Sequence, residues 1–89
     1  MRAPSYTHQF EKDLRRVLRR GKNAEKIKTV IAILIEEEPL ADRYRDHALL
    51  GNYNSRRECH IESDWLLVYK LVTNEIIFER TGTDSDLFG

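Results

Sequence analysis

The sequence is poor in residues on which several classes of protein depend. Its 89 residues include one cysteine, two prolines, four glycines and one tryptophan. A single cysteine, Cys59, cannot form an internal disulfide, which favours a reducing compartment. No apolar run approaches about 18 residues, and the N-terminus lacks the apolar stretch of a signal peptide. We therefore expect a cytoplasmic protein that neither crosses a membrane nor is exported.

The motifs of several enzyme classes are also missing. The sequence contains no Walker loop, no glycine-rich dinucleotide loop and no nucleophile elbow. Its candidate metal ligands lack the short paired spacing of a zinc site: Cys59, His47, His60 and Asp64. We expect neither a cofactor nor a bound metal.

The charge is balanced overall but unevenly distributed along the chain. Residues 1–28 contain nine basic and three acidic residues, a net of +6, although the whole chain has a net charge of +0. Basic side chains cluster near the end of the first predicted helix and are candidates for binding RNA: Arg15, Arg16, Arg19 and Arg20. The alternative is an ordinary solvated helix face, which the pattern alone favours.

Hydrophobic periodicity predicts two helices in the first half. One runs between a capping Thr7 and a terminating Gly21, and the other between a capping Asn23 and residues 36–39. Residues 40–53 show no periodicity and are predicted to be irregular. A short strand over residues 2–6 would lie at a sheet edge because it contains a proline.

The second half is predicted to form strands. Three segments are rich in aromatic and β-branched residues: 56–61, 65–71 and 76–80. Residues 72–74 supply a tight turn between the last two. Helices followed by meandering strands predict one α+β domain over residues 1–89. Its two N-terminal helices would pack on one face of a small, mainly antiparallel β-sheet and leave the other face for chemistry.

Side-chain alternation assigns faces within each predicted strand. In the first, Glu58 and His60 point to one face and Cys59 to the other. In the last, the same rule puts Phe78 and Arg80 on one face. The register between strands is open, so alternation does not decide whether His60 and Arg80 share a face.

Several polar side chains fall at predicted element ends and turns, where functional groups are common: His47, His60, Asp64, Arg80 and Asp84. A base, an acid and a fixed cation suffice to cleave RNA, because its 2′-OH supplies the nucleophile. Structural alternatives exist for each residue. Asp64 can close a turn, Trp65 can belong to the core, and Arg80 can pair with a carboxylate across the sheet. Residue type alone favours these alternatives.

The order of these residues resembles a known family. The matching blocks are Arg45-Asp46-His47-x-Leu49-x-Gly51, His60-Ile61-Glu62-x-Asp64-Trp65-Leu66-x-x-Tyr69-Lys70-Leu71, Phe78-Glu79-Arg80-Thr81-Gly82-Thr83 and Leu87-Phe88-Gly89. They cover nearly the whole chain and are similar to the YafQ-like branch of the RelE/ParE superfamily of bacterial toxins. The resemblance implies a type II toxin with a RelE-like α+β fold. Such a toxin is held inactive by a cognate antitoxin and cleaves mRNA in the ribosomal A site without a metal.

The resemblance also implies roles for individual residues. His47 and His60 fall on active-site histidines of the family, and Asp64 falls on its active-site aspartate. Arg80 matches the arginine expected at the phosphate. Two aromatic residues, expected to contact RNA bases, complete the site: Trp65 and Phe88. Which of His47, His60 and Asp64 acts as the base is left open.

The sequence departs from the family pattern at Asp84, where the pattern Arg-Thr-Gly-Thr-His has a histidine regarded as a principal proton donor. At pH 7 an ordinary imidazole, with a pKa of about 6.5, is about one-quarter protonated, whereas an ordinary aspartic acid is protonated in about one molecule per thousand. An anion near phosphate also opposes RNA binding. We therefore expect an attenuated or inactive nuclease unless another group donates the proton.

Two other functions compete with the nuclease. The ParE branch of the same superfamily inhibits DNA gyrase, so a non-nuclease toxin or a protein that only binds its antitoxin is one alternative. A small RNA- or ribosome-binding module that uses residues 15–22 is the other. For the toxin we expect a monomer when free and a larger hetero-oligomer with the antitoxin, with the ribosome and mRNA as further partners. The charge of residues 1–28 favours an antitoxin with an acidic or amphipathic segment.

Overall fold

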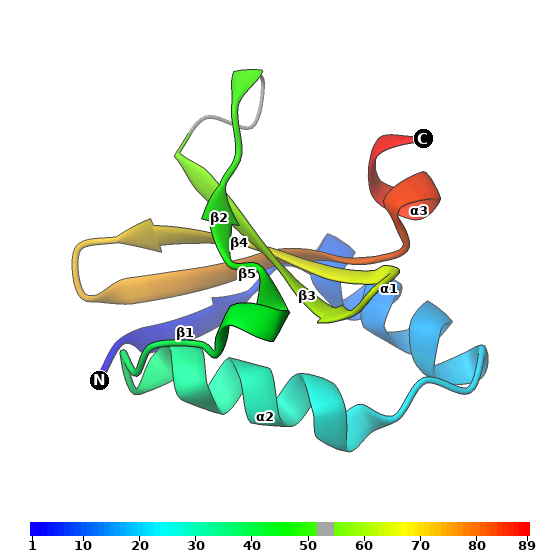
Figure 1. The fold of residues 1–89 in the computed structure, drawn as a ribbon, viewed down its shortest axis with the longest axis horizontal. Helices are drawn as coiled ribbons and strands as arrows, with labels where there is room; N and C mark the ends of the chain where they lie inside the picture. The colour runs from blue at the N-terminus through cyan, green and yellow to red at the C-terminus, as the bar shows by residue number, and fades with distance from the viewer. Residues whose placement is uncertain (52–54) are drawn as a thin grey trace.

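The computed structural model describes residues 1–51 and 55–89 (Figure 1). Its two long helices lie in the first half of the chain and most of its strands in the second. The first half contains β1 (Ala3–Tyr6), α1 (His8–Arg19), α2 (Ala24–Ile35) and the 3-10 helix η1 (Asp42–Tyr44). The second half contains β2 (His47–Ala48), β3 (Arg56–Glu62), β4 (Trp65–Val72), β5 (Glu75–Gly82) and the short helix α3 (Asp84–Phe88).

The strands form one five-stranded sheet in the order β1-β5-β4-β3-β2. Among the described strands, β1 pairs in parallel with β5, and the other neighbours are antiparallel. The predicted edge position of the proline-containing strand is confirmed. The prediction that residues 40–53 are irregular is wrong in part, because η1 and β2 lie within them. Residues 52 and 53 of that segment are outside the described residues.

The predicted helix boundaries are confirmed by their caps. The side chain of Thr7 accepts a hydrogen bond from the backbone N–H of Phe10, and that of Asn23 accepts one from Glu25. Gly21, with a φ of +96°, follows the end of α1 in a backbone conformation that other residues rarely adopt. Both helices therefore start and stop for local reasons that the sequence contains.

The main core lies between the two helices and one face of the sheet (Figure 1). It consists of Phe10, Val17, Ile27, Val30, Leu34, Cys59, Ile61, Trp65, Leu67, Tyr69, Ile76 and Phe78. A smaller cluster of Leu66, Val68 and Leu87 covers part of the opposite face, with Leu49 packed against it. The expectation that this face is left for chemistry therefore holds only in part.

A β-bulge in β5 changes the face on which Arg80 lies. Val68 of β4 pairs with Arg80, but the next residue, Tyr69, pairs with Phe78, so that Glu79 is an extra residue in β5. Residues directly paired across strands share a face, which puts Arg80 beside Val68 and away from the core ring of Phe78. The prediction that Arg80 and Phe78 share a face is wrong, because simple alternation does not reveal a bulge.

None of the helices within the described ranges combines the length and apolar character that a membrane crossing requires.

Candidate active site

Two predicted site residues meet on the sheet face opposite the helices. The short strand β2 pairs His47 with Glu58 of β3, two residues before His60. The two imidazole rings have their centroids 6.3 Å apart. Each ring places its Nε2 atom 3.5 Å from Oε1 of Glu58. The side chain of His47 is 50% exposed and that of His60 is 19% exposed, so solvent can reach both.

Backbone carbonyl groups define the tautomer of each histidine. Nδ1 of His47 lies 2.6 Å from the carbonyl oxygen of Arg45, and Nδ1 of His60 lies 3.2 Å from that of Ser63. Because a carbonyl oxygen only accepts hydrogen bonds, each Nδ1 carries the donated proton. A neutral ring then presents its lone pair at Nε2, the nitrogen that faces the sheet surface. Either histidine can therefore accept a proton at that position.

Glu58 is a site residue that was not among those predicted from the sequence. Its side chain is 9% exposed and places a carboxylate oxygen next to both Nε2 atoms. A carboxylate in this position stabilises the imidazolium that forms when the ring takes up a proton at Nε2. The signal was available, because alternation had already placed Glu58 and His60 on one face of one strand.

Arg80 is held by a buried carboxylate of α1. Its Nε lies 2.7 Å from Oδ2 of Asp13, and its Nη2 lies 3.3 Å from Oδ1. Asp13 also accepts hydrogen bonds from the Gln9 side chain and the Thr81 backbone N–H. Burial by itself would raise the pKa of Asp13, but the hydrogen bonds from Arg80, Gln9 and Thr81 outweigh it and lower that pKa. Arg80 thus pairs with a carboxylate, as the structural alternative proposed, but the partner belongs to a helix and not to the sheet. Of the Arg80 side chain, 31% stays exposed.

Asp64 and Asp84 are brought together at the start of α3. The backbone N–H of Asp84 donates a hydrogen bond of 3.1 Å to Oδ1 of Asp64, and both residues are exposed. Asp64 thereby joins the turn between β3 and β4 to the C-terminal helix. This contact gives Asp64 a structural role, and its part in proton transfer stays a prediction.

The helix α3 is fixed by Asp86. Oδ2 of Asp86 accepts hydrogen bonds from Nη1 of Arg20 at 2.7 Å and from the backbone N–H of Thr83 at 3.0 Å. Nη2 of Arg16 lies 3.9 Å from the same oxygen. The Arg20 guanidinium and the Thr83 N–H hold the pKa of Asp86 well below its usual range. Gly82 allows this contact, because a Cβ there would lie 2.9 Å from Oδ2 of Asp86.

The four arginines predicted to bind RNA are therefore divided into two pairs. Arg20 is engaged by Asp86, and Arg16 donates a hydrogen bond of 3.2 Å to Asp13 and lies 3.9 Å from Asp86. Arg15 and Arg19 are exposed on α1. Of these four residues, Arg15 and Arg19 can bind RNA without breaking a contact to α3.

The two aromatic candidates differ in exposure. Trp65 is 0% exposed and donates a hydrogen bond of 2.9 Å from Nε1 to Oγ1 of Thr81. A buried ring has no face to offer a base, so the structure favours the core alternative for Trp65 and contradicts its expected stacking on RNA. Phe88, at the end of α3, is 39% exposed and remains a candidate for base contact.

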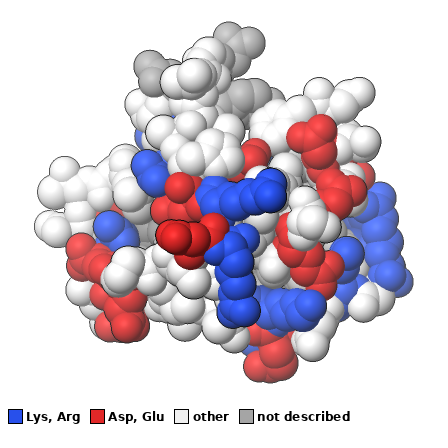
Figure 2. Space-filling model, in the orientation of Figure 1, with Lys and Arg blue, Asp and Glu red and all other residues white. Residues whose placement is uncertain are grey.

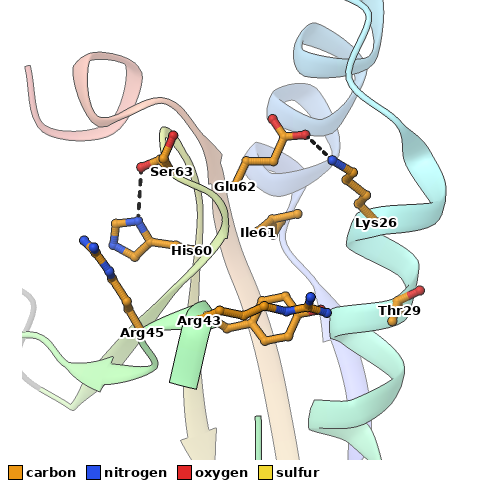
Figure 3. A pocket seen from close by; sticks show the side chains of 9 residues that line it. Lys26, Thr29, Arg43, Arg45, His60, Ile61, Glu62 and Ser63 are labelled. Atoms are coloured by element: carbon orange, nitrogen blue, oxygen red, sulfur yellow. Dashed lines mark hydrogen bonds and ion pairs between the residues drawn. The ribbon is translucent and has the colours of Figure 1, made fainter. Parts of the chain in front are cut away.

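A pocket of about 590 Å³ opens beside His60, between α2, η1 and the turn that joins β3 to β4 (Figure 3). It is lined by Lys26, Thr29, Arg43, Tyr44, Arg45, His60, Ile61, Glu62 and Ser63. The side of the His60 ring that carries Nδ1 faces Ser63 at this pocket, while Nε2 faces Glu58. The pocket and the histidine cluster are therefore adjacent and share His60.

The thiol of Cys59 is buried, which limits its chemistry. Burial raises the pKa of Cys59 to about 12, so its thiolate is not available as a nucleophile at neutral pH. Among the described residues there is no group of three or more His, Cys, Asp or Glu arranged to hold a metal ion.

Comparison with known proteins places the chain among the toxins of bacterial type II toxin–antitoxin systems. It belongs to the YafQ family, whose model, described as "Bacterial toxin of type II toxin-antitoxin system, YafQ", matches residues 2–89. The chain is 41% identical over 85 residues to the mRNA interferase toxin YafQ of Escherichia coli strain K12, a match that covers 94% of this chain and 92% of that protein.

Solved structures of related toxins have the same fold. The toxin in the Escherichia coli DinJ–YafQ complex superimposes with a TM-score of 0.94 at 40% identity and covers 100% of both chains. A copper-bound mutant toxin from Helicobacter pylori gives a TM-score of 0.94 at 38% identity, covering 99% of this chain and 100% of that one. These similarities confirm the predicted α+β architecture and the resemblance to YafQ-like toxins.

Proposed function

We propose that this toxin is a ribosome-dependent, metal-independent endoribonuclease that cleaves mRNA in the A site by attack of the RNA 2′-OH. The observation that carries the proposal is the placement of His47 and His60 around Glu58, on a sheet face to which a bulge also brings Arg80. The Escherichia coli relative is named an mRNA interferase, which supports the same chemistry. Translating ribosomes are the proposed target, so we expect the toxin to act in the cytoplasm.

The proposed reaction needs only groups that this site contains. The neutral Nε2 of one histidine removes the proton from the 2′-OH, whose oxygen attacks the adjacent phosphorus. The bond to the 5′-oxygen of the next nucleotide breaks, leaving a 2′,3′-cyclic phosphate and a 5′-hydroxyl once that oxygen takes up a proton. The exposed part of the Arg80 guanidinium stabilises the charge that builds up on the phosphate oxygens.

Asp84 makes the proton donor the weak point of this mechanism. Its backbone N–H is held by Asp64, and its side chain is a carboxyl where the family pattern has an imidazole. The second histidine of the cluster, when protonated, offers a replacement acid next to Glu58. We therefore propose a nuclease that is slower than its histidine-containing relatives.

A cognate antitoxin is the proposed protein partner. The Escherichia coli relative has been solved in complex with DinJ, which supports a comparable partner for this chain. The basic character of residues 1–28 suits an acidic or amphipathic antitoxin segment. We propose that the free toxin is monomeric and that larger assemblies form with the antitoxin. An antitoxin affinity that does not change with salt would rule out the electrostatic part of this proposal.

The proposed function is tested by adding the purified chain, freed of antitoxin, to a translating ribosome extract and mapping mRNA 5′ ends. Codon-phased cuts that require ribosomes are the expected result, and His60→Ala should abolish them. Intact mRNA despite ribosome binding would show a catalytically disabled toxin. Intact mRNA without ribosome binding would favour the ParE-like, non-nuclease alternative.

A further inference from the structure

The pocket beside His60 is lined by cations that are not among the site residues predicted from the sequence. Lys26, Arg43 and Arg45 line it together with one carboxylate, Glu62. In the space-filling view, Lys and Arg side chains lie in the middle of the face where η1 is in front of the sheet, with acidic side chains beside them (Figures 1 and 2). These three cations are separate from the basic residues of α1. Lys26 belongs to α2, Arg43 belongs to η1, and Arg45 directly follows η1.

We propose that this pocket binds backbone phosphates of the single-stranded RNA segment next to the cut site, an inference that rests on the proposed function. The two sites share one residue, because His60 lines the pocket and directs its Nε2 at Glu58. A strand whose 2′-OH lies at the histidines therefore has neighbouring nucleotides over the pocket. Those phosphates need cations, which the pocket supplies.

Arg43 is arranged in advance for such a contact. Its guanidinium carbon lies 4.8 Å from the centroid of the Tyr44 ring, and its Nη2 donates a hydrogen bond of 2.8 Å to the Tyr44 hydroxyl. Stacking on an aromatic ring limits the rotamers of an arginine, while the edge of the guanidinium still offers donors to a phosphate. Arg43 is exposed and Tyr44 is partly buried against the core, so the outer face of the guanidinium also suits stacking by an RNA base.

Arg45 is directed at the boundary between the pocket and the histidines. Its backbone has a φ of 48°, and its carbonyl oxygen accepts a hydrogen bond from Nδ1 of His47. Figure 3 shows its side chain extending alongside the His60 ring. It enters none of the ion pairs found among the described residues, so its charge is available to a ligand.

The single carboxylate of the pocket is already neutralised. Glu62 accepts hydrogen bonds from Lys22 at 2.7 Å and from Lys26 at 2.8 Å, and these contacts lower its pKa. Glu62 therefore does little to repel a polyanion. An acidic protein segment would meet the same charges, but the shared histidine and the stacked Arg43–Tyr44 pair favour RNA.

The test is RNA binding by the whole chain, measured by fluorescence anisotropy over a range of salt concentrations. The probe is a short single-stranded RNA with 2′-O-methyl groups, which cannot be cut. For the double variant Arg43→Ala/Arg45→Ala we expect the salt slope of log K to fall by about 1.4, since each phosphate contact on a single strand contributes about 0.7. Affinity near 0.1 M salt should drop by about 10-fold or more.

Two matched variants separate this site from general charge. Lys12→Ala/Lys28→Ala removes two exposed lysines of α1 and α2 that lie outside the pocket, and it should keep most of the affinity. Arg43→Lys/Arg45→Lys keeps both charges and should keep the salt slope. The proposal would be overturned if Arg43→Ala/Arg45→Ala and Lys12→Ala/Lys28→Ala lost RNA affinity equally, or if Arg43→Ala/Arg45→Ala lost none. Weaker antitoxin binding by Arg43→Ala/Arg45→Ala with unchanged RNA binding would also overturn it.

The failure of this inference differs from the failure of the proposed nuclease. If the unaltered chain binds the methylated RNA through the arginine pair but never cuts mRNA on ribosomes, the nuclease is wrong and the pocket stands. If the unaltered chain cuts mRNA and the variant Arg43→Ala/Arg45→Ala binds RNA normally, only the proposed role of the pocket is wrong. Thermal melting of each variant establishes that it is folded, which the exposure of Arg43 and Arg45 leads us to expect.

Discussion

Asp13 of α1 and Arg80 of β5 form a two-point ion pair, with Nε 2.7 Å from Oδ2 and Nη2 3.3 Å from Oδ1. Asp13 is 1% exposed, whereas Arg80 reaches from this buried anchor to the surface. A carboxylate at the boundary between helix and sheet therefore fixes the cation that is proposed to meet the phosphate. The helices consequently contribute to the geometry of the site as well as to the core.

Replacing Asp13 by asparagine should destabilise the fold and weaken cleavage together. Removing one partner of a fully buried pair costs about 3–5 kcal/mol, and because Arg80 can still reach solvent we expect about 1–3 kcal/mol. Urea unfolding measures this loss as a lower midpoint at constant slope. Gln9→Ala is the control, since it removes a neutral donor to the same carboxylate and should cost about 1 kcal/mol or less. A similar loss in both variants would show that the ion pair has no special weight.

The same pair predicts a pH dependence of stability. The pKa of Asp13 is lower in the folded protein than in the unfolded chain, where an aspartate has a pKa of about 3.9. Its contribution is therefore fully present above about pH 5 and is lost as the pH falls through the folded-state pKa. Unfolding of the unaltered chain and of Asp13→Asn between pH 7 and pH 3 should show a gap that narrows only at the acid end. A gap that is constant down to pH 3 would contradict this.

Features set by local chemistry could be predicted from the sequence. Thr7, Asn23 and Gly21 determine helix ends through contacts within a few residues, and all three were assigned correctly. The strands β3 to β5 follow from runs of apolar residues. The edge position of β1 follows from Pro4, which lacks a backbone donor.

Features that depend on distant partners could not be predicted in this way. Asp13 and Arg80 are separated by 67 positions, and nothing near Asp13 marks it as a site residue. The bulge at Glu79 depends on how β5 pairs with β4, and it reverses the face deduced for Arg80. The two-residue strand β2 is too short to show alternation, although it is what brings His47 to Glu58.

Replacing Glu58 by glutamine should slow cleavage without unfolding the protein. The substitution keeps the shape of the side chain but removes the negative charge 3.5 Å from both Nε2 atoms. We expect a loss of about 10-fold or more, because the imidazolium formed during proton transfer loses its counter-charge. Single-turnover cleavage on ribosomes measures the effect. Glu79→Gln is the matched control, since Glu79 pairs with Arg56 and not with the histidines; an equal loss there would point to general destabilisation.

The contact between Arg20 and Asp86 predicts that Arg20 acts through α3. Arg20→Ala and Asp86→Ala should each lower cleavage, and the double variant should lose little more than either single one. The losses should stay below about 10²-fold, the scale of misplacing a reacting group by about 1 Å.

Exchanging the charges distinguishes this role from direct RNA binding. Arg20→Asp/Asp86→Arg restores an ion pair of the opposite orientation but not the hydrogen bond from the Thr83 backbone N–H, so it should recover part of the cleavage lost in Arg20→Ala. If Arg20 instead contacts phosphate directly, the exchanged protein stays as impaired as Arg20→Ala. Asp86→Ala then costs less than Arg20→Ala, because it removes a competing anion and loses only the α3 cap. Cleavage rates of the four variants, compared at equal thermal stability, decide between the two roles.

Replacing Asp84 by histidine should accelerate the toxin. Asp84 stands at the first position of α3, where its backbone N–H is already held by Asp64, so an imidazole can be introduced without disturbing that contact. If a general acid is what the site lacks, ribosome-dependent cleavage should rise by about 10²-fold or more. Asp84→Asn serves as the control, because it removes the negative charge without supplying a proton donor. Equal gains in both variants would mean that charge repulsion is the deficit. An unchanged rate in both would show that the histidine pair already supplies the proton and that Asp84 does not limit the reaction.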